Sequence, residues 1–75
     1  MSKLPTVTGK QVITALEKVD FVVQRQKGSH VRLKDQNGRV VTVPNHANKT
    51  LGKGLLLKIL KDAELSKEEF IDLLN

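Results

Sequence analysis

The fold of this 75-residue chain is decided by residues 29–43, which read SHVRLKDQNGRVVTV. Apolar and polar residues alternate on both sides of Gln36-Asn37-Gly38, a pattern typical of two half-buried strands joined by a turn. A two-residue turn would pair Leu33 with Thr42, whereas a three-residue loop with its glycine in the left-handed conformation pairs Leu33 with Val41. Only the longer loop gives each face a consistent character, so it is the hairpin we predict.

This register assigns the side chains of both strands to faces. It sets Asp35 opposite Arg39 beside the loop, where the opposite charges attract. The helix-facing side receives Val31, Leu33, Val41 and Val43, and the outer side receives His30, Arg32, Lys34 and Thr42. We therefore expect the imidazole of His30 on an open polar face or at its rim, and not in the core.

Helical and strand signals precede this hairpin. Thr8 and Gln11 have the spacing of a capping box, which predicts a helix over about Gly9–Val19. Apolar residues recur along that segment at helical spacing. Phe21–Arg25 then reads as a first strand that turns at Lys27-Gly28.

Two helices are predicted after the hairpin. Pro44 ends the last strand because proline cannot donate to a ladder, and residues 45–53 read as a polar loop. Ser66 and Glu69 form a second capping box before a short final helix. The expected buried residues are Leu55, Leu56, Ile59, Leu60 and Ala63 in the longer helix and Phe70, Leu73 and Leu74 in the final one.

The predicted fold class is α+β, in the order αβββα with a further short helix. Helices would cover one face of a three-stranded antiparallel sheet. The length fits a single domain over residues 1–75.

Composition excludes several classes of site. There is no cysteine, which rules out disulfides and thiolate metal sites. A site built on the two histidines lacks further ligands, and the glycines do not have the spacing of a nucleotide-binding loop. We therefore expect no metal and no small-molecule cofactor. No signal peptide or long apolar segment is evident, so no membrane association is expected and the expected compartment is the cytoplasm.

Positive charge is concentrated in one part of the chain. Before Leu55 there are ten Lys or Arg and three Asp or Glu, whereas the remainder has three and five. A basic sheet region beside an acidic helical end favours a polyanionic partner. The cations around His30 that could contact phosphate are Arg25, Lys27, Arg32, Lys34, Arg39, Lys49 and Lys53.

His30 is the strongest candidate for acid–base chemistry. Histidine is the side chain whose ordinary pKa lies nearest neutrality, so it can both take and give a proton. On RNA, a base would remove the 2′-hydroxyl proton, and an acid would protonate the departing 5′-oxygen. Nearby cations would hold the phosphate. The opposing interpretation is a solvated strand histidine with no role.

His46 is a second candidate acid or base. If the third strand continued past Pro44, His46 would share the parity of Thr42 and point to the side of His30. The opposing interpretation is a loop histidine that hydrogen-bonds backbone. Ser29 cannot form a serine–histidine pair with His30, because adjacent strand residues point to opposite faces.

An ordered set of motifs resembles the HicA toxins. The set comprises Gly28-Ser29-His30, Gly38-Arg39, Val43-Pro44-Asn45-His46, Gly54 ahead of residues 55–61, and Leu65-Ser66-Lys67-Glu68-Glu69-Phe70. The resemblance implies a ribosome-independent mRNA interferase with a double-stranded-RNA-binding-domain-like fold and a HicB antitoxin as partner. It implies a catalytic His30, with metal-independent cleavage and mRNA as substrate. The expected RNA-binding residues are Arg25, Lys27, Gly28, Ser29, Arg32, Lys34, Lys49 and Lys53.

One position departs from the family pattern, and two alternative functions stay open. Glu64 stands where relatives often have glycine, so the backbone there is either left-handed and strained or the helix ends differently.

The first alternative to a catalytic toxin is a non-catalytic RNA-binding module, since such modules share the αβββα order. Their final long helix usually begins with lysines, whereas here Leu55-Leu56-Leu57 follows Lys53. An inactive relative that binds another protein is the third interpretation.

Overall fold

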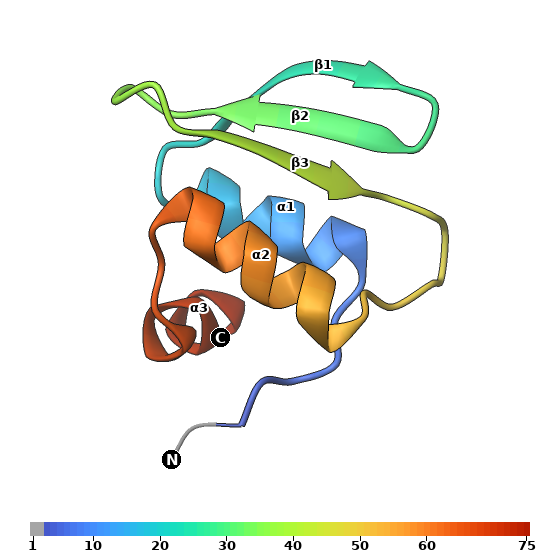
Figure 1. The fold of residues 1–75 in the computed structure, drawn as a ribbon, viewed down its shortest axis with the longest axis vertical. Coiled ribbons are helices and arrows are strands. Elements are labelled where there is room, and N and C mark those ends of the chain that lie inside the picture. Colours follow the sequence, from blue (N-terminus) through green and yellow to red (C-terminus); the bar gives the residue numbers. More distant parts are fainter. Residues whose placement is uncertain (1–2) are drawn as a thin grey trace.

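The chain forms a sheet layer and a helical layer in a computed structural model that describes residues 3–75. Helices α1 and α2 lie against one face of the sheet, and α3 lies beyond them, away from the sheet (Figure 1). This is the predicted α+β arrangement with helices on one face. The elements in chain order are α1 (Gly9–Glu17), β1 (Val22–Lys27), β2 (His30–Lys34), β3 (Val40–Pro44), α2 (Lys53–Ala63) and α3 (Lys67–Leu74).

The β2–β3 hairpin has the predicted register. Leu33 lies opposite Val41, and Val31 lies opposite Val43. Gly38 has a φ of 85°, which is the left-handed conformation that the three-residue loop requires. All four of these apolar residues are buried, so the inner face of the hairpin forms part of the core.

Strand β1 is antiparallel to β2 and contains a bulge that the sequence pattern did not predict. Val23 lies opposite Leu33 and Arg25 lies opposite Arg32, which leaves Gln24 as the extra residue. A bulge of this kind reverses the facing of the residues beyond it. The strand also continues two residues past the predicted end, to Lys27.

Helix α1 begins as predicted and ends earlier than expected. The Thr8 side chain accepts from the Gln11 N–H and the Gln11 side chain accepts from the Thr8 N–H, completing the capping box. The helix ends at Glu17 instead of Val19, because Asp20 adopts a left-handed φ of 71°. The N–H of Phe21 then donates to the Leu16 carbonyl, which turns the chain into β1.

The core is aliphatic apart from two buried phenylalanines. One prediction was wrong: Leu55 is 38% exposed, because it lies off the face of α2 that packs on the sheet. In α3, Phe70 is buried, and Leu73 and Leu74 pack partly buried against the core. The buried set is Val7, Val12, Ala15, Leu16, Phe21, Val31, Leu33, Val41, Val43, Leu56, Ile59, Leu60, Ala63 and Phe70.

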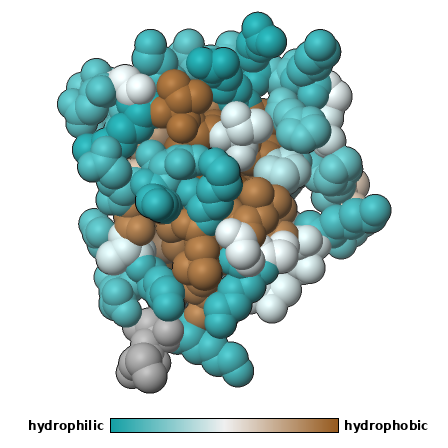
Figure 2. All heavy atoms as spheres, viewed as in Figure 1, coloured by the Kyte–Doolittle hydropathy of each residue, from teal (hydrophilic) through white to brown (hydrophobic). Residues whose placement is uncertain are grey.

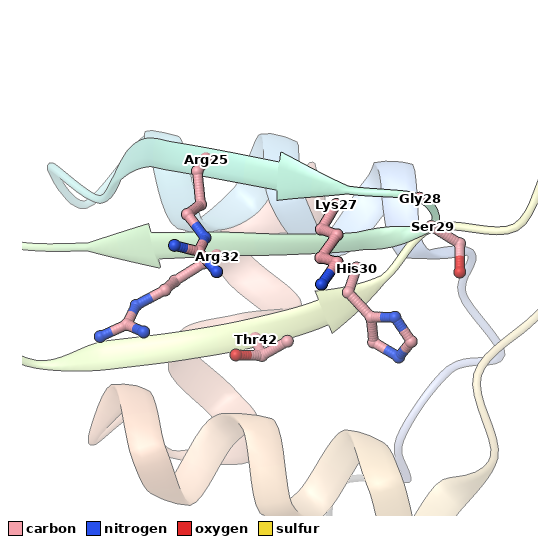
Figure 3. A pocket seen from close by; sticks show the side chains of 7 residues that line it. All are labelled: Arg25, Lys27, Gly28, Ser29, His30, Arg32 and Thr42. Atoms are coloured by element: carbon pink, nitrogen blue, oxygen red, sulfur yellow. The ribbon is translucent and has the colours of Figure 1, made fainter.

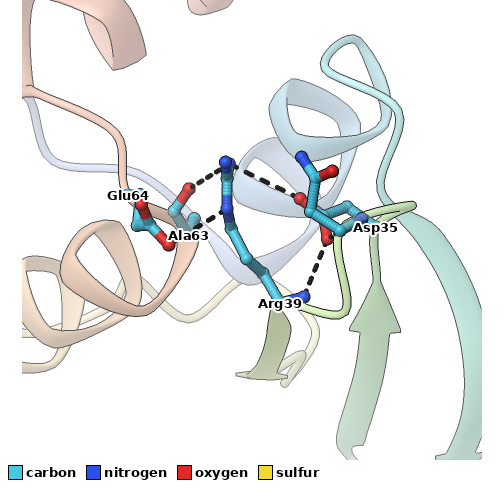
Figure 4. Close-up of polar contacts among 5 residues, drawn as sticks. Asp35, Arg39, Ala63 and Glu64 are labelled. Carbon is cyan, nitrogen blue, oxygen red and sulfur yellow. Dashed lines mark hydrogen bonds and ion pairs between the residues drawn. The ribbon is translucent and has the colours of Figure 1, made fainter.

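Arg39 joins the hairpin loop to the end of α2 (Figure 4). Its guanidinium lies 3.5 Å from Asp35 and 3.1 Å from Glu64, and it donates to the Ala63 carbonyl. Glu64 is the C-cap of α2 and has a left-handed φ of 56°. The departure from glycine therefore leaves a left-handed backbone at this position, with the Glu64 carboxylate paired to Arg39.

Candidate active site

A hollow of about 720 Å³ on the outer face of the sheet brings together most of the predicted site residues (Figure 3). Every member comes from β1, β2, β3 or the β1–β2 turn. The lining residues are Arg25, Lys27, Gly28, Ser29, His30, Arg32 and Thr42.

The β1–β2 turn positions His30. Gly28 has a φ of 59°, which glycine adopts without steric cost, and the Gln26 side-chain amide donates to the Gly28 carbonyl. This two-residue turn sets Lys27 directly opposite His30, while Pro44 of β3 lies opposite on the other side. The imidazole is exposed, at the end of the hollow nearest to the turn.

The bulge at Gln24 supplies the second pair of cations. Because Arg25 is opposite Arg32, both guanidinium groups extend from the outer face of the sheet (Figure 3). Among residues 3–75, no ion pair involves Arg25, Lys27 or Arg32, and no carboxylate lines the hollow. Their charges are thus directed at solvent around a single exposed imidazole.

The other predicted contact residues lie elsewhere. Lys34 lines a separate hollow whose other residues include Glu17, Asp20 and Asp35. Lys49 and Lys53 are exposed and do not line the hollow around His30.

His46 lies in the loop after β3, apart from His30. Strand β3 ends at Pro44, so the condition for His46 to share the facing of Thr42 is not met. His46 borders a different hollow with Thr8 and Asn45. Its Nε2 is 3.2 Å from the Ser29 Oγ, and Ser29 also lines the larger hollow. Ser29, which precedes His30 in the β1–β2 turn, therefore connects His46 to the larger hollow.

Sequence reasoning missed one lining residue and one structural cause. Thr42 was placed on the outer face but not in the site, although the register that pairs Leu33 with Val41 also sets Thr42 opposite Arg32. The bulge at Gln24 left a weaker signal, namely that Phe21 and Arg25 have the same parity but opposite character. That conflict could have indicated an extra residue between them.

The arrangement fits an anionic ligand. The hollow offers hydrogen-bond donors and positive charge through an exposed imidazole, three unpaired cations and a hydroxyl. Phosphate oxygens accept hydrogen bonds from such donors and are attracted by the positive charge. Within residues 3–75 there is no group of three or more histidine, cysteine, aspartate or glutamate side chains placed to hold a metal ion. The same residues include no helix with the length and apolar character needed to span a bilayer.

Comparison with known proteins identifies the family. A search of curated proteins gave no match. The sequence pattern described as the HicA toxin of bacterial toxin–antitoxin systems matches residues 9–65, which contain the β1–β2 turn, His30, Arg32 and Thr42. This match covers most of the chain and every element of the outer sheet face. The chain therefore belongs to the HicA toxin family of bacterial toxin–antitoxin systems.

Proposed function

We propose that this chain is an endoribonuclease toxin that cleaves mRNA without the ribosome, with His30 as its catalytic residue. The observation that carries the proposal is the position of His30 among Lys27, Arg25 and Arg32, in a hollow without carboxylates. Cations hold a phosphodiester, and an imidazole beside it can exchange protons near neutral pH. With mRNA as substrate, the compartment is the cytoplasm.

The reaction uses the RNA's own 2′-hydroxyl as nucleophile. A base removes its proton, the oxygen attacks the adjacent phosphorus, and the bond to the 5′-oxygen breaks as an acid protonates that leaving group. The products are a 2′,3′-cyclic phosphate and a 5′-hydroxyl. His30 takes the base role, the acid role, or both in turn, and no metal ion takes part in the step.

The three cations bind and stabilise the phosphate. Arg25 and Arg32 lie side by side across β1 and β2, so their guanidinium groups can contact neighbouring phosphates of one strand. Lys27 lies opposite His30 and can neutralise charge that develops at the reacting phosphate. Affinity should therefore fall steeply with salt concentration.

His46 is proposed as the second acid or base, acting through Ser29. The 3.2 Å contact between its Nε2 and the Ser29 Oγ connects it to the hollow. A contribution that operates through Ser29 predicts a smaller loss in a His46 variant than in a His30 variant.

The partner is proposed to be a HicB-like antitoxin protein that covers His30 and the surrounding cations. Such coverage would block access of RNA to the hollow. An acidic surface on the antitoxin would complement the charges of Arg25, Lys27 and Arg32.

The deciding experiment is cleavage of ribosome-free RNA by purified protein, with His30→Ala as the test variant and His46→Ala as the comparison. His30→Ala should lose about 10²–10⁴-fold in rate, the usual contribution of a general acid or base. Circular dichroism should show an unchanged fold, because His30 is exposed. Expression of His30→Ala should also no longer arrest growth.

Three outcomes would contradict parts of the proposal. Cleavage by His30→Ala at the wild-type rate would refute the catalytic assignment. Loss of cleavage in EDTA, restored by added metal, would refute the metal-free mechanism. RNA that is bound by the wild type but never cleaved would identify a non-catalytic RNA-binding module instead.

A further inference from the structure

A second hollow adjoins the one around His30. Its volume is about 300 Å³, at the lower end of the range for small-ligand sites. His30 of β2 and Thr42 in the middle of β3 line both hollows, so the two share a border on the outer face of the sheet. The second hollow then extends between β3 and α2, where Leu55 and Ile59 contribute side chains.

The two hollows differ in chemistry. The first is lined by three cations, whereas the second has an apolar floor that includes Val40, Leu55 and Ile59. Leu55 is 38% exposed at this point on α2. Hydrophobic surface reaches solvent in the middle of the face shown in Figure 2, where α2 lies, and hydrophilic residues border it.

A nucleotide presents the same two kinds of surface. Its phosphate is anionic, and its base is a flat ring with weakly polar faces. This chain has no tryptophan or tyrosine, and both phenylalanines are buried, so none of these rings is available to stack on a base. An aliphatic floor beside the phosphate-binding hollow can hold a base by its face, because contact with the ring removes apolar surface from water.

The rim of the second hollow carries an ion pair that can contact the edge of a base. Lys58 Nζ lies 3.0 Å from Asp62 Oδ2, and both residues line the hollow. Asp62 Oδ1 accepts no hydrogen bond from residues 3–75. A carboxylate oxygen accepts from the amino groups of adenine, cytosine and guanine, which uracil lacks.

We propose that this second hollow holds the base next to the scissile phosphate, with Leu55 under its face and Asp62 selecting for an amino-bearing base. The inference rests on the proposed ribonuclease function and adds its specificity subsite. A strand bound with one phosphate at His30 and neighbouring phosphates at Arg25 and Arg32 would place one base between β3 and α2.

The test compares Leu55→Ala with Leu57→Ala. Leu57 is on the same helix, is 36% exposed and lines neither hollow, so it controls for the loss of a surface leucine. Cleavage of a defined RNA should slow at least about tenfold in Leu55→Ala, the lower end of what one lost apolar contact in a substrate pocket costs. Leu57→Ala should cleave at the wild-type rate.

The second arm maps cleavage positions with Asp62→Asn against Asp72→Asn. Asp72 carries the same charge on α3, away from the sheet (Figure 1). Asp62→Asn should raise the share of cuts beside uridine at least about threefold, since a neutral amide oxygen accepts more weakly from an amino group and the new amide N–H can donate to the uracil O4 carbonyl. Asp72→Asn should keep the wild-type pattern.

The outcomes separate this inference from the function on which it rests. If the wild type cleaves RNA in a His30-dependent way, but Leu55→Ala and Asp62→Asn match it in rate and positions, the base subsite is wrong and the ribonuclease stands. If Leu55→Ala loses only its affinity for the antitoxin, the hollow is a protein contact and the inference is equally wrong. A wild type that cleaves no RNA overturns both.

Discussion

A methyl group added at Gly9 should destabilise the protein, because α1 begins in direct contact with the end of β3. A Cβ at Gly9 would collide with the Pro44 carbonyl oxygen and lie 2.9 Å from the Asn45 Cα. Both are backbone atoms, and the Asn45 N–H donates to the Ser29 carbonyl at 2.6 Å, so neither can move without disturbing the site. Overpacking of this kind costs about 1–3 kcal/mol, which the better helix propensity of alanine offsets by at most ~1.

Because both obstacles are backbone atoms, the cost lies at the upper end of that range, and we expect Gly9→Ala to lower the free energy of unfolding by about 2 kcal/mol. The total for a 75-residue chain is only about 4–11 kcal/mol, so the loss is easily measured. The assay is urea unfolding followed by far-ultraviolet circular dichroism, with an unchanged slope against urea as the check on two-state behaviour.

Gly54→Ala is the matched control. Gly54 also lies in the first turn of a helix, but a Cβ there would meet no atom within 4 Å. The substitution should raise stability by up to about 1 kcal/mol, through helix propensity alone. A Gly9→Ala variant that unfolds at the wild-type urea concentration or above it would refute the contact between α1 and β3 as described here.

Three further predictions concern the loops and the last helix. Asp35→Ala should lower the free energy of unfolding in urea by about 2–3 kcal/mol, because the Asp35 side chain is only 6% exposed and accepts from the N–H groups of Asn37 and Arg39. A decrease below about 0.5 kcal/mol would contradict this role. Glu64→Gly should raise the free energy of unfolding by roughly 0.5–1 kcal/mol, since relief of the left-handed φ outweighs the loss of an exposed ion pair to Arg39. A lower melting temperature for Glu64→Gly would show instead that the ion pair outweighs the backbone strain. Hydrogen bonds from the Ser66 backbone, and to a lesser extent from its side chain, hold the pKa of Glu69 below its ordinary 4.5. The wild type should therefore be more stable than Glu69→Gln above pH 4.5, and this difference in the free energy of unfolding should vanish as the pH falls through the lowered pKa. A stability difference that does not change with pH in paired urea titrations would exclude this linkage.

The hairpin register could be predicted because one face had to be apolar. A one-residue slip would have exchanged the burial of every side chain on β2, so the pairing of Leu33 with Val41 was strongly determined. The capping boxes were equally readable, since each depends on two residues three apart. Both predictions use information within a few residues of sequence, and both were confirmed.

Features that depend on how helices and strands pack together were harder to predict from the sequence. Leu55 reads as a buried helix residue, yet only tertiary packing decides which leucines of α2 face the sheet. The contact of His46 with Ser29 follows from a loop path that has no sequence periodicity. The hollow between β3 and α2 has the same origin, because its walls come from segments distant in sequence.

The bulge in β1 reconciles two demands that a regular strand cannot meet. Phe21 faces the core, whereas Arg25 and Lys27 face the hollow on the outer side of the sheet, and in an unbroken ladder all three would share one side. The tight turn fixes Lys27 opposite His30, so the conflict has to be resolved between Arg25 and Phe21. The extra residue, Gln24, falls in that interval. Core packing and the cationic hollow therefore both depend on a single irregularity, which lies between Phe21 on the core side and Arg25 on the outer side of the sheet.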